Sequence, residues 1–298
     1  MGNFMKNAII ATSIVTFLTF TLVGCGGGGG GGDVISNSEK LLITDTNKKE
    51  IATSSYGALG YSMLSFSVGL SEMLISSDVL DILAEKGISN RAAPITCENA
   101  DGRHNVSVDG DKTTHIYVNC KSGTITRDGE LTITNESRTK KRIEYNNYKF
   151  KGIADGDNID VKIKEASVNA ELGSPDIKKV DVNLKDAYLE YDGQDYTFLN
   201  FVHKLDKSVA HKEESSFSGY YKSSLTSDKW VNIKSKSSII SRDDDAIDCP
   251  ISGELEVVGK DGSKLSAKHQ SDGTVRVYVN GDYKATYDCS DFGLPLFD

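Results

Sequence analysis

Residues 274–281 read TVRVYVNG, in which apolar and polar side chains alternate until the chain reaches an Asn-Gly pair. Alternation of this kind is typical of a strand with one buried and one solvated face. Asn-Gly adopts the positive φ angles that a two-residue hairpin turn requires. The same pattern continues backwards to about residue 94, with alternating segments at 115–118 and 130–134. Asp-Gly or Asn-Gly pairs separate these segments at 101–102, 109–110, 128–129, 155–156, 192–193, 261–262, 272–273 and 280–281.

Longer segments with strand composition lie at 158–172, 178–191, 195–205 and 228–240. The links between them are short, which favours consecutive antiparallel pairing over parallel strands joined by crossover helices. The sequence therefore predicts a mainly β (α+β) fold. We expect residues 89–298 to form a large, curved antiparallel meander with N-terminal helices packed on it.

Residues 39–88 read as the helical segment. Leu59, Met63 and Phe66 begin a stripe of apolar residues at helical spacing, and we expect two helices at about 47–75 and 78–86. The stripe suits a helix packed on its own sheet, a helix lying on a membrane surface, or a partner-binding helix. Lys and Arg are absent from 51 to 84, so packing on the sheet is favoured. We expect 39–88 and 89–298 to form one unit.

The amino terminus has the organisation of a secretory signal. Lys6 precedes an apolar segment at 8–23, which is short for a membrane-spanning helix. It ends in Leu22-Val23-Gly24-Cys25, which resembles the bacterial lipobox. The resemblance implies that residues 1–24 are a lipoprotein signal peptide and that Cys25 receives acyl chains such as palmitate. An ordinary signal peptide and an uncleaved anchor helix are the alternatives.

Residues 25–38 are predicted to be a lipidated, glycine-rich tether, because Gly26 to Gly32 form an unbroken run. The resemblance also bears on location: in such lipoproteins of two-membrane bacteria, an Asp directly after the lipidated cysteine marks the protein for retention in the inner membrane. Gly26 stands in that place, so we expect attachment to the outer membrane. Whether the domain is on the periplasmic face or the cell surface stays open.

Four cysteines remain after Cys25, and an even number in an exported chain favours disulfides. Three connectivities are possible. We expect Cys97–Cys120 and Cys249–Cys289, since each pair brackets a local set of hairpins. A zinc site with four thiolate ligands is the alternative, and it is not favoured because the chain has no Cys-x-x-Cys spacing.

No residue set points to catalysis or to a cofactor. The chain has no Gly-x-Ser-x-Gly elbow, phosphate-binding loop or His-Glu-x-x-His motif, and its five histidines are scattered. Its formal net charge of −9 argues against nucleic acid as a partner. Two acidic clusters, at 155–160 and 243–248, could attract calcium, but neither follows the EF-hand order, so no metal site is predicted.

The lipobox, the glycine run and the stretches at 46–57 and 252–282 together resemble a group of proteobacterial outer-membrane lipoproteins. In that group the last turn is often a run of alternating Asp and Gly, of which only Asn280-Gly281-Asp282 is present here. No activity is established for the group, so the resemblance implies location and fold alone.

Three functions are compatible with these features. The leading hypothesis is a non-enzymatic lipoprotein, held on the outer membrane by its lipid, that acts as a structural or binding module and contacts another envelope or extracellular component. The second is a carrier or acceptor of lipid or lipoprotein acyl chains in a cavity between sheet and helix. The third, an exported hydrolase, has no support beyond abundant Ser, Asp and Tyr.

Overall fold

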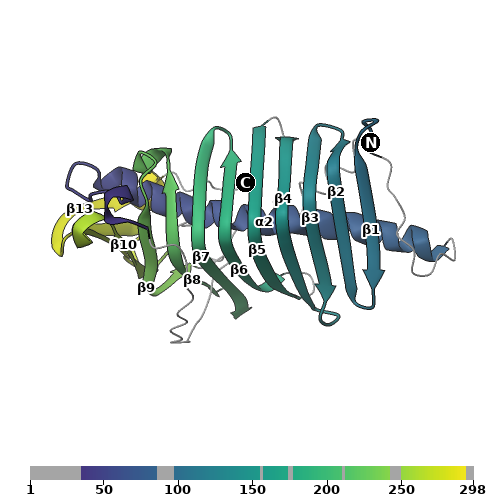
Figure 1. The fold of residues 1–298 in the computed structure, drawn as a ribbon. Helices are drawn as coiled ribbons and strands as arrows, with labels where there is room; N and C mark the ends of the chain where they lie inside the picture. Colours follow the sequence, from purple (N-terminus) through teal and green to yellow (C-terminus); the bar gives the residue numbers. More distant parts are fainter. Residues whose placement is uncertain are drawn as a thin grey trace.

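Thirteen strands form one open antiparallel sheet in sequence order, β1 to β13 (Figure 1). The computed structural model describes residues 35–85, 97–154, 157–173, 177–209, 212–241 and 250–292; for 70–85 it describes the backbone. This is the antiparallel meander that the sequence predicts. The strands are β1 Arg103–Asp109, β2 Lys112–Ser122, β3 Ile125–Asn135, β4 Lys140–Ala154, β5 Asp157–Leu172, β6 Ile177–Tyr191, β7 Gln194–Val209, β8 Lys212–Ser223, β9 Val231–Ser241, β10 Ser252–Val258, β11 Lys264–His269, β12 Thr274–Val279 and β13 Asp282–Asp288.

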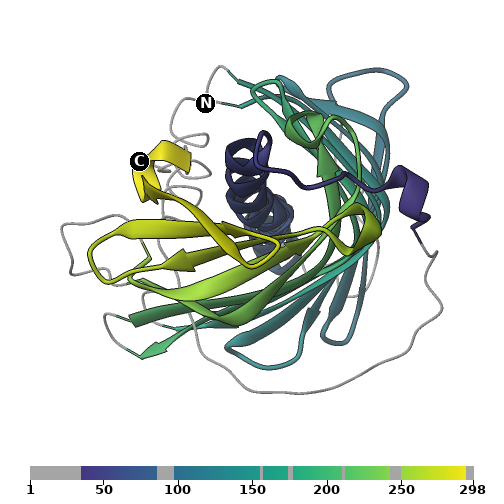
Figure 2. The ribbon, with the colours of Figure 1, turned by 90° about the vertical axis from the view of Figure 1, so that its left-hand side faces the viewer.

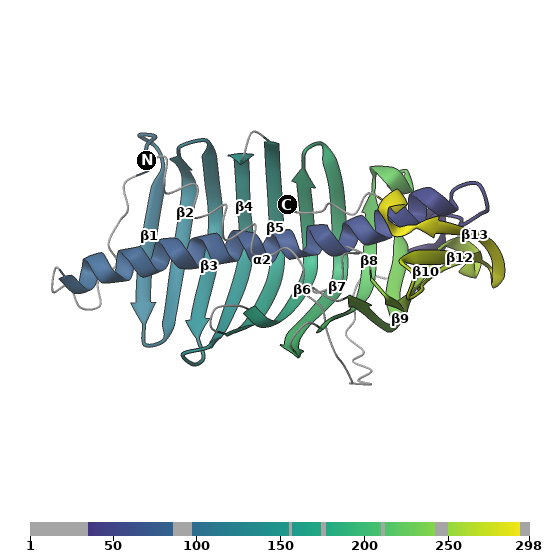
Figure 3. The same cartoon turned by 180° about the vertical axis from the view of Figure 1, so that it is seen from behind.

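One long helix, α2 (Lys48–Glu85), lies on the concave face of the sheet and crosses its strands (Figures 2 and 3). It starts at the β8–β13 end and extends past β1 (Figure 3). The described residues also include four short 3-10 helices: η1 Asn37–Glu39, η2 Ser224–Thr226, η3 Lys260–Gly262 and η4 Cys289–Phe292.

The expectation of two helices was wrong, because α2 is continuous from residue 48 to residue 85. Ser77, at the expected boundary between the two helices, lies inside α2. Serine is only mildly unfavourable within a helix, so a serine alone does not end one. At about 1.5 Å per residue, 38 residues span roughly 57 Å, which lets one helix cross many strands.

Two glycines of α2 lie where the helix approaches the sheet most closely. A Cβ atom on Gly57 would collide with the hydroxyl and ring of Tyr196, and one on Gly69 with the side chains of Tyr145 and Ile143. These glycines argue against a continuous helix by propensity. In the structure they provide the space that tyrosines of β7 and β4 occupy.

Bulges on neighbouring strands bend the long strands. Gly129 (φ 97°) on β3 faces Asn147 (φ 49°) on β4, and a Cβ on Gly129 would collide with the Asn147 carbonyl. Gly219 on β8 and Asn200 on β7 repeat this arrangement. The register shifts beside residue 129, so Asp128-Gly129, expected to be a hairpin turn, is a bulge inside β3.

Most of the other turn pairs are placed as expected. The pairs at 109–110, 192–193 and 280–281 join β1 to β2, β6 to β7 and β12 to β13, and 272–273 lies between β11 and β12. The pair at 261–262 forms part of η3, between β10 and β11. The pair at 101–102 precedes β1, and 155–156 lies outside the described residues.

The core fills the space between α2 and the inner face of the sheet. Met63 and Phe66 of the predicted stripe are buried there, and Leu59 is partly buried against the same cluster. Aromatic side chains of β4 and β7 form a large part of this core. Those with under a tenth of their surface exposed are Tyr145, Tyr148, Phe150, Tyr196, Phe198 and Phe201.

Candidate functional site

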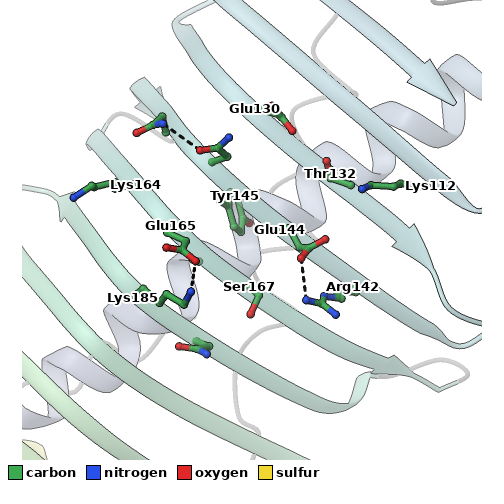
Figure 4. Close-up of a pocket in the computed structure, with 14 residues that line it drawn as sticks. Lys112, Glu130, Thr132, Arg142, Glu144, Tyr145, Lys164, Glu165, Ser167 and Lys185 are labelled. Carbon is green, nitrogen blue, oxygen red and sulfur yellow. Dashed lines mark hydrogen bonds and ion pairs between the residues drawn. The ribbon is translucent and has the colours of Figure 1, made fainter. Parts of the chain in front are cut away.

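A polar groove of about 690 Å³ lies on the outer face of the sheet, opposite α2 (Figure 4). Side chains from β2 to β6 line it. Strand pairing places Thr132, Glu144, Ser167 and Asn183 in one straight row across β3, β4, β5 and β6. We call this row the groove floor.

The groove is hollow because short side chains form most of the floor and longer ones stand on both sides of it. Lys112 and Arg142 stand on one side, and Glu130, Glu165 and Lys185 on the other (Figure 4). Thr132 is buried, and the other three floor residues are half-buried. The floor thus presents hydroxyl, amide and carboxylate groups at the bottom of a charged depression.

Most of the charges around the groove are paired locally. Arg142 donates from Nη2 to Oε1 of Glu144 at 2.9 Å, and Lys185 donates to Glu165. The ammonium of Lys164 lies 3.1 Å from a carboxylate oxygen of Asp186. The first pair joins two residues of β4, and the other two join β5 to β6. The groove therefore has many hydrogen-bonding groups and little excess of either charge.

Sequence reasoning missed this groove. Its residues are ordinary polar members of alternating strands, at 130 and 132, at 142 and 144, and at 183 and 185. Only the register between strands places Thr132 opposite Glu144, and Glu144 opposite Ser167. The alternation in each strand was the available signal. It predicts which face of the sheet a side chain lies on, but not which residues of the adjacent strands lie beside it.

A second polar cluster is buried between helix and sheet. Nδ1 of His203 lies 2.8 Å from the Ser62 hydroxyl, and Nε2 lies 3.0 Å from the Ser215 hydroxyl. Burial lowers the pKa of His203 to about 4, so the ring is neutral at pH 7. A serine beside a neutral histidine is a nucleophile pair in some hydrolases. Ser62 and Ser215 are both buried, so a substrate cannot reach them in this structure.

His269 takes part in a similar contact nearer the start of α2. Its Nε2 lies 2.8 Å from the hydroxyl of Tyr56, and burial lowers its pKa to about 4. Tyr56 also packs against Phe292 of η4. These contacts fix the helix to β11 and to the C-terminal turn.

One of the two expected disulfides is present: Cys97 and Cys120 are bonded, with their Cα atoms 5.3 Å apart. Cys289 is also disulfide-bonded, and its partner lies outside the described residues. Cys249 is outside as well, so the pair Cys249–Cys289 stays a prediction.

The residues of the expected lipid anchor, Leu22, Val23, Gly24 and Cys25, lie outside the described residues. No helix in the part of the chain that the structure describes is both long and apolar enough to span a bilayer.

Most residues of the two acidic clusters lie outside the described residues. Residues 243–248 and Asp155 fall outside the described ranges, while Asp160 is buried and pairs with Lys151 and Lys162. Within those ranges, no group of three or more His, Cys, Asp or Glu residues could hold a metal ion.

Comparison with known proteins gives no relative. No protein-family model, no curated protein and no solved structure matches this chain. The fold and the geometry of the groove are therefore the basis for any functional argument.

Proposed function

We propose that this chain is a lipid-anchored, non-enzymatic binding module of the bacterial cell envelope, held on the outer membrane through Cys25. The polar groove on the outer sheet face is the observation that carries the binding role. It is preformed on paired strands and is concave, and it lies on the face that α2 leaves open. Ligand-binding sites are typically concave and largely preformed, and polar groups in them fix the orientation of the ligand.

The chemistry of the groove favours a polar partner. The floor presents Thr132, Ser167 and Asn183 with the paired carboxylate of Glu144, and no aromatic side chain is exposed there. Tyr145 contributes to the lining from its backbone side, because its ring is buried and its hydroxyl donates to the Ser65 carbonyl. We therefore expect an envelope or extracellular component rich in hydroxyl, amide or carboxylate groups.

A carrier or acceptor of lipid or lipoprotein acyl chains is the alternative. It needs an apolar cavity between helix and sheet. In the described part of that interface, Tyr56, Phe66, Tyr196 and Phe201 belong to one buried cluster. An acyl chain could enter only by displacing such side chains, so the groove gives the better account.

An exported hydrolase is the less favoured alternative. The Ser62–His203 contact is buried, and His203 is bonded to a second serine and not to a carboxylate. A triad needs a third group that orients the histidine and stabilises its charged form.

Site-specific photo-crosslinking in intact cells tests the binding role. A photoreactive residue at Asn183, on the groove floor, is expected to yield a discrete adduct. The same residue at Tyr283, which is 57 % exposed on β13, is the control and should yield none. Equal adducts at both positions, or none at Asn183, would contradict a binding role for the groove.

Metabolic labelling tests the anchor separately. Labelled palmitate is expected to enter the native chain and to be lost with Cys25→Ser, which should also be released from the outer membrane. A Cys25→Ser chain that stays membrane-bound at full length contradicts lipid anchoring, whatever the groove binds.

A further inference from the structure

The chain reaches the domain at one defined place. Just after Ile35, the side chain of Asn37 donates to Asp261 of η3 at 2.6 Å and accepts from the Asp261 amide at 2.9 Å. Trp230 then donates its backbone N–H to Glu39 at 3.0 Å. Figure 2 shows η1 and the segment after it crossing the end of the sheet from which α2 starts. The predicted tether of residues 25–38 therefore ends earlier than expected, at about Ile35, and joins the domain beside β9 and η3.

Aromatic, aliphatic and lysine side chains gather around this entry point. Leu42 is 49 % exposed, and Leu225, on the turn that joins β8 to β9, is 37 % exposed. The ammonium of Lys222 lies 5.4 Å from the ring centre of Trp230. We call this surface the tether-side patch; its members are Lys40, Leu42, Tyr220, Lys222, Leu225 and Trp230.

Contacts join four members of the patch directly, and Leu225 lies on η2, between β8 and β9. Lys40 forms a β-bridge with Trp230 and holds its ammonium 5.8 Å from the ring centre of Tyr220. Leu41 donates to the Trp230 carbonyl at 3.0 Å, which places Leu42 next to the bridge. Trp230 is the only tryptophan of the chain.

Such a combination suits the interface of a bilayer. Tryptophan and tyrosine favour the headgroup level because one end of each ring system is apolar and the other is polar. Lysine can extend its charge to phosphate while its stem covers apolar surface. Glu39 and Asp228 flank the patch together with Lys229, so the lysine charges are largely offset, and aromatic and aliphatic contact supplies most of its affinity for lipid.

The expected anchor lies within reach of this surface. Ile35 comes ten positions after Cys25 in the sequence. A glycine-rich chain of that length has a root-mean-square span of roughly 16–19 Å. Because a lipid on Cys25 holds the membrane this close, even weak contact with the patch would orient the whole domain.

We propose that the tether-side patch rests on the headgroup layer of the membrane to which Cys25 is anchored. The occupant of this surface is the bilayer itself. The inference depends on the lipid anchor proposed above and adds the face that the domain turns toward the membrane. The groove floor on β3 to β6 then begins two strands away from β8, which carries Tyr220 and Lys222.

Fluorescence of Trp230 in the lipidated full chain tests the contact. The protein is incorporated into vesicles of phosphatidylethanolamine with a minor share of phosphatidylglycerol, with or without bromine on the acyl chains near the headgroups. We expect Trp230 emission to move to shorter wavelength than in the unlipidated Cys25→Ser chain. We also expect brominated lipid to quench most of it.

A displaced tryptophan is the matched control. Trp230→Phe combined with Ile116→Trp puts the fluorophore on β2, where Ile116 is 42 % exposed. Six strand spacings separate β2 from β8, or about 29 Å. Quenching in this variant is expected to be several-fold weaker. Leu42→Glu, with Trp230 kept, should also reduce quenching while the protein still floats with the vesicles.

The outcomes separate the two proposals. If the chain floats with the vesicles but Trp230 is not quenched, or if both tryptophan positions are quenched equally, the orientation is wrong and the anchor stands. If the lipidated chain does not float with the vesicles, the anchor fails and this inference fails with it.

Discussion

At the scale of single residues, glycine and tyrosine decide how closely helix and sheet approach. Gly57 and Gly69 each lie under a tyrosine of the sheet, Tyr196 and Tyr145. The hydroxyl of Tyr145 also donates to the Ser65 carbonyl of α2. The missing side chains of the helix are thus matched by large side chains of the strands.

Gly57→Ala tests this arrangement. Alanine favours the helix by about 1 kcal/mol over glycine, yet its Cβ would collide with the buried ring of Tyr196. We expect a net loss of about 1–3 kcal/mol in the free energy of unfolding, measured by urea titration, because overpacking a dense core costs more than propensity returns. Adding Tyr196→Phe, which removes the nearest atom, should recover part of the loss. A stabilised Gly57→Ala protein would contradict the close contact.

The Cys97–Cys120 disulfide fixes the edge of the sheet. It links Cys97, which precedes β1, to Cys120 near the end of β2, and the two cysteines are 23 positions apart in the sequence. Replacing both cysteines by alanine is expected to lower the free energy of unfolding by about 3 kcal/mol, the loop-closure value for such a separation. Reductant should lower the stability of the native protein by breaking this bond, an effect that the double variant should lack. If its unfolding matches that of the oxidised native protein, the bond does not stabilise the edge.

At the scale of elements, α2 is held to the sheet by apolar packing and by neutral histidines. His203 contacts Ser62, and His269 contacts Tyr56, both from the sheet to the helix. Burial lowers the pKa of each ring to about 4, against about 6.5 when unfolded. Protonation of either ring therefore opposes the docking of α2.

The pH dependence of stability follows from these pKa values. Both rings are neutral in both states above pH 7, so stability is full there. Between pH 6.5 and 4 the unfolded chain binds more protons, and the free energy of unfolding should fall by about 1.4 kcal/mol per pH unit for each histidine. Urea titrations at pH 7, 6 and 5 measure this slope before the carboxylates contribute.

Variants of the two histidines isolate their share of that slope. His203→Gln and His269→Gln keep a polar group but do not titrate in this range. Each is expected to reduce by up to one the difference in bound protons between the unfolded and folded chain, which lowers the slope of stability against pH, whatever its effect on stability at pH 7. A slope unchanged from the native protein in both variants would show that the rings are not buried and neutral.

At the scale of the whole molecule, α2 connects strands that are distant in the sheet. Through Tyr56, Ser62 and Ser65 the helix contacts β11, β7 and β4. Neighbouring strands alone would give a chain of local pairings, whereas the helix makes them depend on one another. The domain should therefore unfold as one unit.

Phe66→Ala tests this cooperativity. Phe66 is fully buried at the middle of α2, and its truncation should cost about 3–5 kcal/mol. We expect the urea midpoint to fall by the same amount when followed by Trp230 fluorescence, near β9, and by far-ultraviolet circular dichroism, over the whole sheet. Two separated transitions would indicate that the sheet unfolds in parts and that α2 does not couple them.

Much of the fold can be predicted from short stretches of this sequence. The alternation at 274–279 and the turn pairs at 109–110, 192–193 and 280–281 predict consecutive antiparallel strands, because a period of two and a positive φ are properties of a few adjacent residues. Leu22-Val23-Gly24-Cys25, which resembles a lipobox, and the glycine run likewise predict a lipid anchor from the sequence alone.

Contacts between distant residues were decided only in three dimensions. α2 is continuous because packing on the sheet outweighs weak stop signals, and Asp128-Gly129 is a bulge because Asn147 on the next strand lies against it. The groove floor exists because register aligns Thr132, Glu144 and Ser167. The physical reason is the same in each case: periodicity fixes which face a side chain takes, while its neighbours on that face depend on strands far away in the sequence.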